Sequence, residues 1–397
     1  MADSPGLITD AAECAAFCER QAGADYITVD TEFMRENTFW PKLCLVQVGG
    51  PEEAAAIDPL APGMDLAPLF ALMADQSVLK VFHSARQDIE IFVNLAGAVP
   101  MPLFDTQVAA MVCGFGDSVG YETLVNRLAG AQVDKTSRFT DWSRRPLTEK
   151  QLRYALADVV HLRPIYEKLH RQLAESNRDH WLAEEVSVLT DPATYRVEPE
   201  DAWRRIKTRS NDPRFFACLR EVAAWREREA QKRDLPRGRL LRDDALTEIA
   251  AHAPRTVEEL GRTRGLSRSM AEGWQGAGLI AAVERALAIP PDQRPRPPER
   301  VRPPQGIGPV IELLRVLLKM KCDSNDVAQK LVANASDLEM IAVDDKADVP
   351  ALRGWRRELF GEDALALKHG RLGLAIDRGR VRLIPAGEAP ARKSAKG

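Results

Sequence analysis

The stretch Tyr26–Phe33, YITVDTEF, combines the composition of a β-strand with two carboxylates. Its Tyr, Ile, Val and Phe residues favour extended structure, and its threonines suit a pleated sheet. Side chains in a strand alternate between two faces, so Asp30 and Glu32 point to the same side. Like charges placed side by side repel each other unless a cation lies between them. The stretch therefore predicts a strand whose acidic face needs a positive partner.

The segments around this strand alternate between strand-like and helix-like patterns. Strands are predicted at Ala24–Phe33, Leu43–Val48, Ala54–Asp58, Val78–His83 and Leu103–Asp105, with a helix at Leu66–Ala74. Short connections between the first three strands favour an antiparallel meander. We expect residues 1–195 to form one α/β domain with a mixed five-stranded sheet and flanking helices.

Strand patterns give way to helical ones after this domain. We expect a helical domain at 205–290 and a second helical module at 305–385. Between them, residues 291–304 form a linker rich in Pro and Arg, which is extended and semi-rigid. Residues 386–397 are expected to form a basic tail.

The composition excludes several classes of protein. Hydrophobic residues make up 45% and charged residues 28% of the 397 residues, as in soluble globular proteins. No apolar run is long enough to span a bilayer, and the N-terminus lacks the features of a secretory signal. The six cysteines form no CxxC pair, so we expect reduced thiols in a cytoplasmic protein.

The net charge is only −3, but acids predominate in residues 1–195, whereas Lys and Arg predominate in residues 196–397. Clustered acids can hold metal ions, and clustered Arg and Lys can bind phosphate. On charge alone, solvated surfaces explain this asymmetry equally well.

Two other segments supply acids that could join the strand pair. In VFHSARQDIEIF, a capping box of Ser84 and Gln87 predicts a helix start, and Asp88 falls in its first turn. The helix dipole alone would favour an acid there. In TEKQLRYALADVVHL, Tyr154 and Asp158 are four residues apart and share one helix face. A buried Tyr hydrogen-bonded to an Asp is the structural alternative.

Taken together, Asp30, Glu32, Asp88 and Asp158 form a set of hard oxygen ligands suited to Mg²⁺ or Mn²⁺. Two such ions can clamp the attacking and leaving oxygens when a phosphodiester is hydrolysed. The Tyr154 hydroxyl could orient the attacking water. The set therefore indicates a two-ion nuclease site.

The same residues resemble a known superfamily. The stretches VDTEF, FHSARQDIEIF and YALAD resemble the three motifs of the DEDD exonucleases, in the form with Tyr in the third motif. Asp30 and Glu32 match the first motif, Asp88 the second, and Tyr154 with Asp158 the third. The stretch SRFTDWSRRPLTEKQLRYALADVVHLRPIY resembles the ribonuclease D family more closely.

The second half extends this resemblance. The stretch FFACLREVAAWREREAQKRDLPRGRLLRDDALTEIAAHAP resembles an HRDC domain, which places such a domain at 205–290. Residues 305–385 resemble a second, more diverged copy. The resemblance thus implies a ribonuclease H-like exonuclease domain followed by two small all-α HRDC-like domains.

The family resemblance also implies an activity. It implies a metal-dependent 3′-5′ exoribonuclease that removes nucleotides one at a time, releasing nucleoside 5′-monophosphates from precursor tRNA 3′ ends and other small structured RNAs. We expect two Mg²⁺ or Mn²⁺ ions, no organic cofactor, no membrane association and a monomer. Asp30 would bridge both ions, Glu32 and Asp158 would complete the ion that activates water, and Asp88 would support the second ion.

Several further residues are candidates for RNA contacts. Phe33 either packs in the core or stacks on a terminal base. Arginines before the third motif, and a basic run in the second half, either bind phosphates or form surface ion pairs. The basic candidates are Arg138, Arg144, Arg145, Arg204, Arg205, Lys207 and Arg209.

Two other functions stay open from the sequence. A DNA-directed or proofreading exonuclease would use the same chemistry, although no polymerase-sized region follows. A nucleic-acid-binding scaffold would carry the same acids in a structural role, and it would show no chelator-sensitive nuclease activity.

Overall fold

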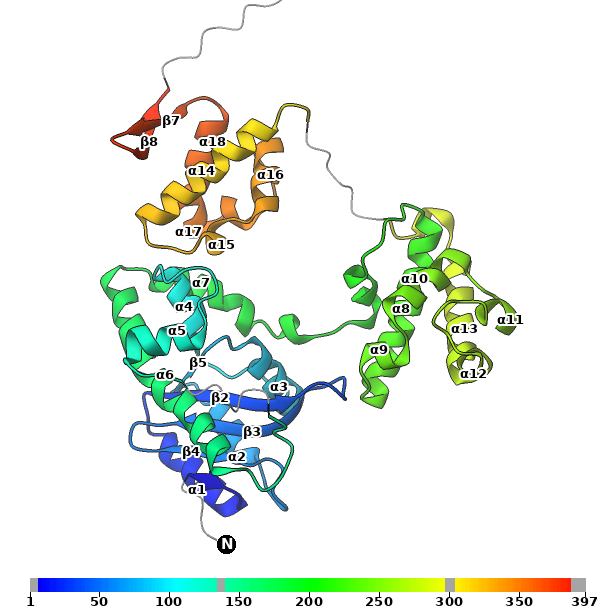
Figure 1. Ribbon diagram of the computed structural model, residues 1–397, viewed down its shortest axis with the longest axis horizontal. Helices are drawn as coiled ribbons and strands as arrows, with labels where there is room; N and C mark the ends of the chain where they lie inside the picture. Colours follow the sequence, from blue (N-terminus) through cyan, green and yellow to red (C-terminus); the bar gives the residue numbers. More distant parts are fainter. Residues whose placement is uncertain (1–5, 134–139, 297–303, 387–397) are drawn as a thin grey trace, which may run out of the picture.

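The computed structural model describes residues 6–133, 140–296 and 304–386, which fold into three domains along the chain (Figure 1). The first domain is α/β, the second is helical, and the third is helical with a small β-hairpin. Within these ranges no helix is both long and apolar enough to cross a membrane. The predicted order of an α/β domain followed by helical domains is confirmed.

The first domain is built on a mixed six-stranded sheet in the order β1-β4-β3-β2-β5-β6. The strands are β1 (Leu7–Ile8), β2 (Tyr26–Met34), β3 (Lys42–Gly49), β4 (Ala54–Ile57), β5 (Leu79–Phe82) and β6 (Leu103–Asp105). Strands β2 to β4 form the predicted antiparallel meander, and the other pairings are parallel. The prediction lacked β1, because two residues are too short to show an alternating pattern.

Helices surround this sheet. They are α1 (Ala11–Gln21), α2 (Ala67–Ala74), α3 (Arg86–Ala96), α4 (Thr106–Val112), α5 (Tyr121–Leu124), α6 (Glu149–Glu175) and α7 (Asp179–Thr190). The face of β2 that carries Ile27 and Val29 is buried in a core shared with α1, α2 and α3. The long helix α6 contacts β2, β3 and β4 (Figure 1).

Helix α6 lies close to the sheet and carries the third motif. It begins with the predicted capping box of Thr148 and Gln151, and it continues through Pro164 to Glu175. The Thr28 hydroxyl on β2 donates to the backbone oxygen of Val159 at 2.8 Å, which ties the helix to the strand. A Cβ at Gly49 would lie 2.5 Å from this hydroxyl, so the close approach needs glycine.

The predicted capping box at the start of α3 is wrong. The Ser84 backbone has a φ of 61°, and no side chain of the cap residue bonds the helix start. Asp105, at the end of β6, instead accepts the backbone N–H groups of Ser84 and Ala85 at 3.0 and 2.9 Å. The turn that presents Asp88 is therefore held by a carboxylate from a neighbouring strand.

The second and third domains follow. The second contains η4 (Pro199–Arg205), α8 (Pro213–Arg233), α9 (Arg237–Leu240), α10 (Asp243–His252), α11 (Val257–Leu260), α12 (Arg268–Glu272) and α13 (Trp274–Ala288). The third contains α14 (Gly308–Ser324), α15 (Gln329–Val332), α16 (Ala335–Val343), α17 (Gly354–Arg356), α18 (Glu362–Lys368), β7 (Leu372–Asp377) and β8 (Arg380–Pro385). The hairpin β7–β8 corrects the expectation that this domain is all-α.

Two expected segments lie partly beyond the described ranges. Residues 297–303 of the linker expected at 291–304 lie outside the described residues, as do residues 387–397 of the expected tail. The short helix η5 (Pro291–Gln293) lies in the described part of the linker.

The second domain holds the loop between β2 and β3. Phe39 in this loop is buried in a small apolar cluster with side chains of α8 and α9. The backbone N–H groups of Phe39 and Trp40 both donate to the Asp234 carboxylate, each at 2.9 Å. Because the loop directly follows β2, this contact restrains the end of the strand that carries Asp30 and Glu32.

The third domain packs on a different part of the first. The indole ring of Trp355 stacks on that of Trp181 in α7, with centroids 4.3 Å apart. The Ala328 N–H donates to the backbone oxygen of Met111 in α4 at 2.9 Å. Arg356 forms an ion pair with Glu185 in α7. Both accessory domains are therefore joined to the first domain by specific polar and aromatic contacts.

Replacing Asp234 by Ala should release the loop between β2 and β3. The change removes a charged acceptor from two backbone donors, so amide hydrogen exchange at Phe39 and Trp40 should speed up about tenfold or more. Exchange in α13 should change little. Asp201→Ala removes an exposed acid of the same domain and serves as the control. Unchanged exchange at both loop amides would contradict this role of Asp234.

Candidate active site

Three carboxylates from two elements converge on the α6 side of the sheet. Oxygen atoms of Asp30 and Glu32 on β2 and of Asp158 on α6 all lie within 4.8 Å of one another. Strand alternation puts the first two acids on one face, while the intervening Thr31 is buried on the other. The packing of α6 then adds the third acid.

Asp88 lies beside this group but is not one of the three acids whose oxygen atoms lie within 4.8 Å of one another. It is buried in the first turn of α3, and the Thr31 hydroxyl donates a hydrogen bond to its carboxylate. Burial raises the pKa of Asp88 well above its usual range, and the charge of Asp30 adds to the rise. The structure therefore brings three of the four predicted acids to one point and leaves the fourth close by.

These carboxylates are costly to ionise without a positive partner. Burial raises the pKa of Asp30 to about 7. Burial, followed by the charges of Asp30, Asp158 and Asp88, raises the pKa of Glu32 to about 10. Burial and the charge of Asp30 raise the pKa of Asp158 to about 8.

The cluster fits a divalent cation. Across the described ranges, no Lys or Arg forms an ion pair with any of these acids. Partly buried, converging carboxylate oxygens that no Lys or Arg of the described residues pairs with are the donor set that Mg²⁺ and Mn²⁺ prefer. The residues present therefore form a candidate site for divalent metal.

Tyr154 lies where its spacing from Asp158 predicts. Its hydroxyl hydrogen-bonds the Asp158 carboxylate, which partly offsets the rise in the pKa of that acid. Its ring lies 6.1 Å from the ring of the buried Trp142, centroid to centroid. The tyrosine is thus oriented from both ends, by an aromatic neighbour and by one of the clustered acids.

A cavity of about 400 Å³ opens beside the acids. Asp30, Tyr154 and Asp158 line it together with His83 and Tyr121. Its volume falls in the range of small-ligand sites. Asp30 and Asp158 thus lie at the wall of a space that can hold a ligand.

Tyr121 is a residue of this site that the sequence analysis missed. Its hydroxyl donates to the backbone oxygen of Asp158, and its ring lies 5.3 Å from the imidazole of His83. His83 in turn has its Nδ1 3.0 Å from the hydroxyl of Thr106. The sequence holds no signal for this role, because Tyr121 lies outside all three motifs and reaches the site only through packing.

Phe33 and Arg138 are the first of the predicted RNA contacts. The register of β2 against β3 shifts between Glu32 and Phe33. Phe33 packs, partly buried, against the core of the first domain, in keeping with the packing alternative. Arg138 lies outside the described residues.

Arg144 and Arg145 differ from each other. Arg144 is exposed and forms an ion pair with Asp141 at 3.2 Å. Arg145 makes two hydrogen bonds of 2.6 Å to the buried Asp58, and a third of 2.7 Å to the backbone oxygen of Cys44. The geometry gives Arg145 a structural role that fastens the segment before α6 to the sheet.

The basic run of the second domain, Arg204, Arg205, Lys207 and Arg209, lies at the surface. Arg204 forms an ion pair with Asp201 at 2.7 Å. These residues belong to the second domain, whereas the acids belong to the first, and none of the four lines the cavity beside the acids. They remain candidates for contacts with a long substrate.

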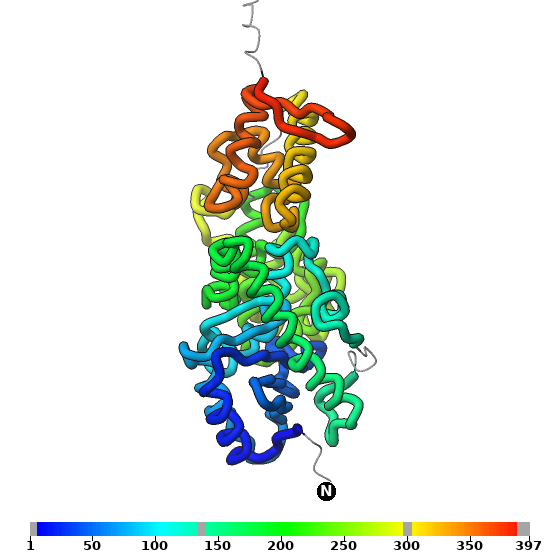
Figure 2. Tube along the Cα trace, turned by 90° about the vertical axis from the view of Figure 1, so that its left-hand side faces the viewer, coloured from blue at the N-terminus to red at the C-terminus, as the bar shows by residue number. Residues whose placement is uncertain are grey.

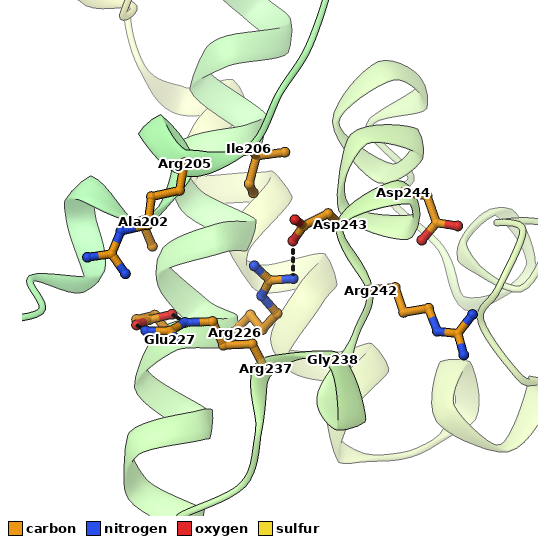
Figure 3. Close-up of a pocket in the computed structure, with 10 residues that line it drawn as sticks. All are labelled: Ala202, Arg205, Ile206, Arg226, Glu227, Arg237, Gly238, Arg242, Asp243 and Asp244. Atoms are coloured by element: carbon orange, nitrogen blue, oxygen red, sulfur yellow. Dashed lines mark hydrogen bonds and ion pairs between the residues drawn. The ribbon is translucent and has the colours of Figure 1, made fainter. Parts of the chain in front are cut away.

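Arg205 also lines a cavity of about 440 Å³ between η4, α8, α9 and α10 (Figure 3). Inside it the buried Arg226 pairs with Asp243 at 2.7 Å, drawn as a dashed line in Figure 3. The fully buried Glu227 pairs with Arg237. Most charges of this cavity therefore neutralise one another, unlike those of the carboxylate cluster.

The fold and the acids define a class of protein. Residues 5–174 match a family model described as 3′-5′ exonuclease, and residues 215–283 match the HRDC domain model. Ribonuclease D of Nitrobacter hamburgensis is 54% identical over 375 residues, which span 94% of this chain and 98% of that protein. Ribonuclease D of Granulibacter bethesdensis is 50% identical, over 97% and 98% of the two chains. The chain belongs to the ribonuclease D family.

Solved structures agree with this assignment. The crystal structure of Escherichia coli RNase D, described as an exoribonuclease involved in structured RNA processing, is 33% identical with a TM-score of 0.79. The match covers 91% of this chain and 98% of that one. The catalytic core of RRP6 from Trypanosoma brucei, 20% identical with a TM-score of 0.53, shares the fold over 71% and 80% of the chains. The chain is a 3′-5′ exoribonuclease.

The stability of the metal-free protein should fall as pH rises. The pKa values of Asp30, Glu32 and Asp158 are raised by folding, so their protonated forms stabilise the fold fully below about pH 4. That stabilisation is lost as pH rises through about 7 for Asp30 and about 8 for Asp158. Bound Mn²⁺ should restore it, so the gain in Tm on adding Mn²⁺ should grow between about pH 5 and pH 8.

The variant Asp30→Asn should flatten the metal-free profile and remove most of the gain from Mn²⁺. Glu149→Gln changes an exposed acid at the start of α6 and is the matched control. A Tm of the wild type that responds neither to pH in this range nor to Mn²⁺ would contradict the metal site.

Proposed function

We propose that this protein trims the 3′ ends of RNA, including the 3′ trailers of precursor tRNAs, by hydrolysing one phosphodiester at a time. The observation that carries the proposal is the convergence of Asp30, Glu32 and Asp158 within 4.8 Å. Membership of the ribonuclease D family supports RNA as substrate. The similarity to the Escherichia coli exoribonuclease involved in structured RNA processing supports structured RNA as the substrate class.

We propose Asp30, Glu32 and Asp158 as ligands of divalent metal, with Asp88 supporting a second ion. Two such ions supply activation of water and stabilisation of the leaving oxygen in phosphodiester hydrolysis. The chain itself holds the carboxylate oxygens at one point. Tyr154 orients the attacking water, because its hydroxyl lies at the cavity and is held by Asp158.

The cavity of about 400 Å³ is the proposed position of the terminal nucleoside. The rings of His83 and Tyr121 form part of its wall, and aromatic rings hold bases by stacking without sequence preference. Such a pocket would accept any RNA end one nucleotide at a time.

The proposed RNA contacts outside this pocket are phosphate contacts. The exposed Arg204, Arg205, Lys207 and Arg209 would bind the RNA body together with Arg144, in a salt-sensitive and sequence-tolerant way. Arg145 is left out of this set because Asp58 and a backbone oxygen occupy its guanidinium.

The proposal also covers organisation. We propose an exonuclease domain at 1–195, an HRDC domain at 205–290 and a second HRDC-like domain at 305–385. We further propose a cytoplasmic monomer. All six cysteines are buried and form no disulfide, which supports a reducing compartment. Light scattering of the purified chain tests the monomer.

A time-resolved digestion of a 5′-labelled, 3′-extended tRNA tests the function. The wild type should shorten the RNA in steps of one nucleotide in Mg²⁺. Asp30→Asn should lower the rate about a thousandfold or more, since a metal clamp contributes several kcal/mol, while RNA still binds. Asp141→Asn is the control, because Asp141 is exposed and outside the cluster. Full activity of Asp30→Asn, or internal cleavage by the wild type, would refute the proposal. A matched DNA oligonucleotide shows whether DNA is also a substrate.

Tyr154→Phe should lower the rate about tenfold to a hundredfold, because it removes an orienting hydroxyl but no metal ligand. The Mn²⁺ concentration for half-maximal activity should change little. Tyr26→Phe removes a hydroxyl that bonds Glu167 away from the site, and it is the matched control. An equal loss in both variants would argue against an orienting role.

A further inference from the structure

The hairpin β7–β8 carries cations that the exonuclease mechanism does not use. It lies at the end of the third domain away from the first domain, drawn in red in Figures 1 and 2. The two strands pair antiparallel from Leu372 with Pro385 to Asp377 with Arg380. Within the described ranges no further strand joins either edge of this ribbon.

One face of the hairpin anchors it to the third domain. Leu374 lies opposite Leu383 across the ribbon, and both pack against the apolar core of that domain. Strand alternation sends the neighbouring residues to the opposite face. The ribbon therefore has an attached side and a free side.

The free side is cationic toward the turn. Arg380 lies opposite Asp377, and Arg382 lies opposite Ala375. All of β8 except Val381 and Leu383 is exposed. Ala375 opposite Arg382 is small, so a chain of phosphates can approach the arginines at the turn end of this side, while the half-exposed Ile384 covers Gly373 farther from the turn. Arg382 pairs with Asp377 at 3.1 Å, although both side chains stay about half exposed.

The turn adds a third arginine in an unfavourable conformation. Arg378 and Gly379 have φ of 49° and 78°, as in the two-residue turns that prefer Asn-Gly. An arginine with positive φ is uncommon and carries a conformational cost. Among the described residues no carboxylate forms an ion pair with Arg378 or Arg380. No ion pair among the described residues therefore explains why arginine occupies this position.

We propose that this hairpin binds phosphates of the RNA body, at a distance from the 3′ end being trimmed. The inference rests on the proposed RNA substrate. Arg378, Arg380 and Arg382 present three cations at one tip, which complements a polyanion. RNA that ends at the carboxylate cluster reaches the far end of the third domain only if its body is large, so short oligomers do not gain from the hairpin.

A protein partner fits the surface less well. The exposed apolar side chains of the hairpin are Ile376, at 80%, and Ile384, at 45%. Strand alternation places them on opposite faces, so they form no contiguous apolar patch of the kind that binds proteins. Charged residues along a free strand also discourage the addition of another strand. The surface thus favours nucleic acid over protein.

The test is the double variant Arg378→Asn/Arg380→Thr. Asn suits positive φ and Thr suits a strand, so the hairpin should keep its fold and melt no lower. Affinity for a 3′-extended tRNA at low salt should fall about tenfold, and the slope of log K against log salt should shrink by about 1.5 to 2. The loss on this RNA should exceed the loss on a short single-stranded oligoribonucleotide about tenfold.

The double variant Arg268→Gln/Arg315→Gln removes two exposed arginines elsewhere and controls for net charge. Unchanged tRNA affinity and salt slope in the hairpin variant would overturn the proposal. The arginines would then serve solubility or a contact with a protein. An equal loss in the control would reduce the effect to overall charge. Failure of the wild type to trim even the short oligomer would instead overturn the proposed function.

Discussion

The burial of like charges at one point is the constraint on which this structure depends. Asp30, Glu32 and Asp158 repel one another in surroundings that raise the pKa of each. Folding must therefore hold them together by other means. The hydrogen bond from the Thr28 hydroxyl on β2 to the Val159 carbonyl on α6 holds the strand and the helix together beside Asp158. A rigid sheet and a long helix locked to it keep the site ready for a cation, which removes the repulsion.

The accessory domains bear on the same site as well as on the substrate. The second domain holds the loop that continues β2, through Asp234. The third domain holds the segment before Tyr121, because the Lys330 N–H donates to Asp117 at 3.0 Å. Both contacts lie on segments that lead to the cavity beside the carboxylates. Both accessory domains therefore contact segments of the first domain that lead to the carboxylates, even though the three hydrophobic cores are separate.

Where the sequence predicted local structure, it did so through short-range regularities. Alternation located β2 and the shared face of its two acids, and the Thr148–Gln151 capping box marked the start of α6. The same signals failed where a distant segment decides the outcome. The start of α3 looks like a capping box, but Asp105 from β6 provides the acceptor instead. The hairpin β7–β8 is short, and a two-stranded ribbon of this kind needs the packing of Leu374 and Leu383 on the core of the third domain.

The sequence by itself determined the residue types of the site and their grouping on individual elements, because strand and helix periods depend only on neighbouring residues. It thereby placed Asp30 beside Glu32, and Tyr154 one turn before Asp158. Only the tertiary structure decided that Asp158 converges with Asp30 and Glu32 while Asp88 lies beside them. It also decided that Tyr121 lines the cavity and bonds the Asp158 backbone, and that Arg145 bonds Asp58. These relations join segments far apart in the chain, and the packing of the whole domain sets their distances.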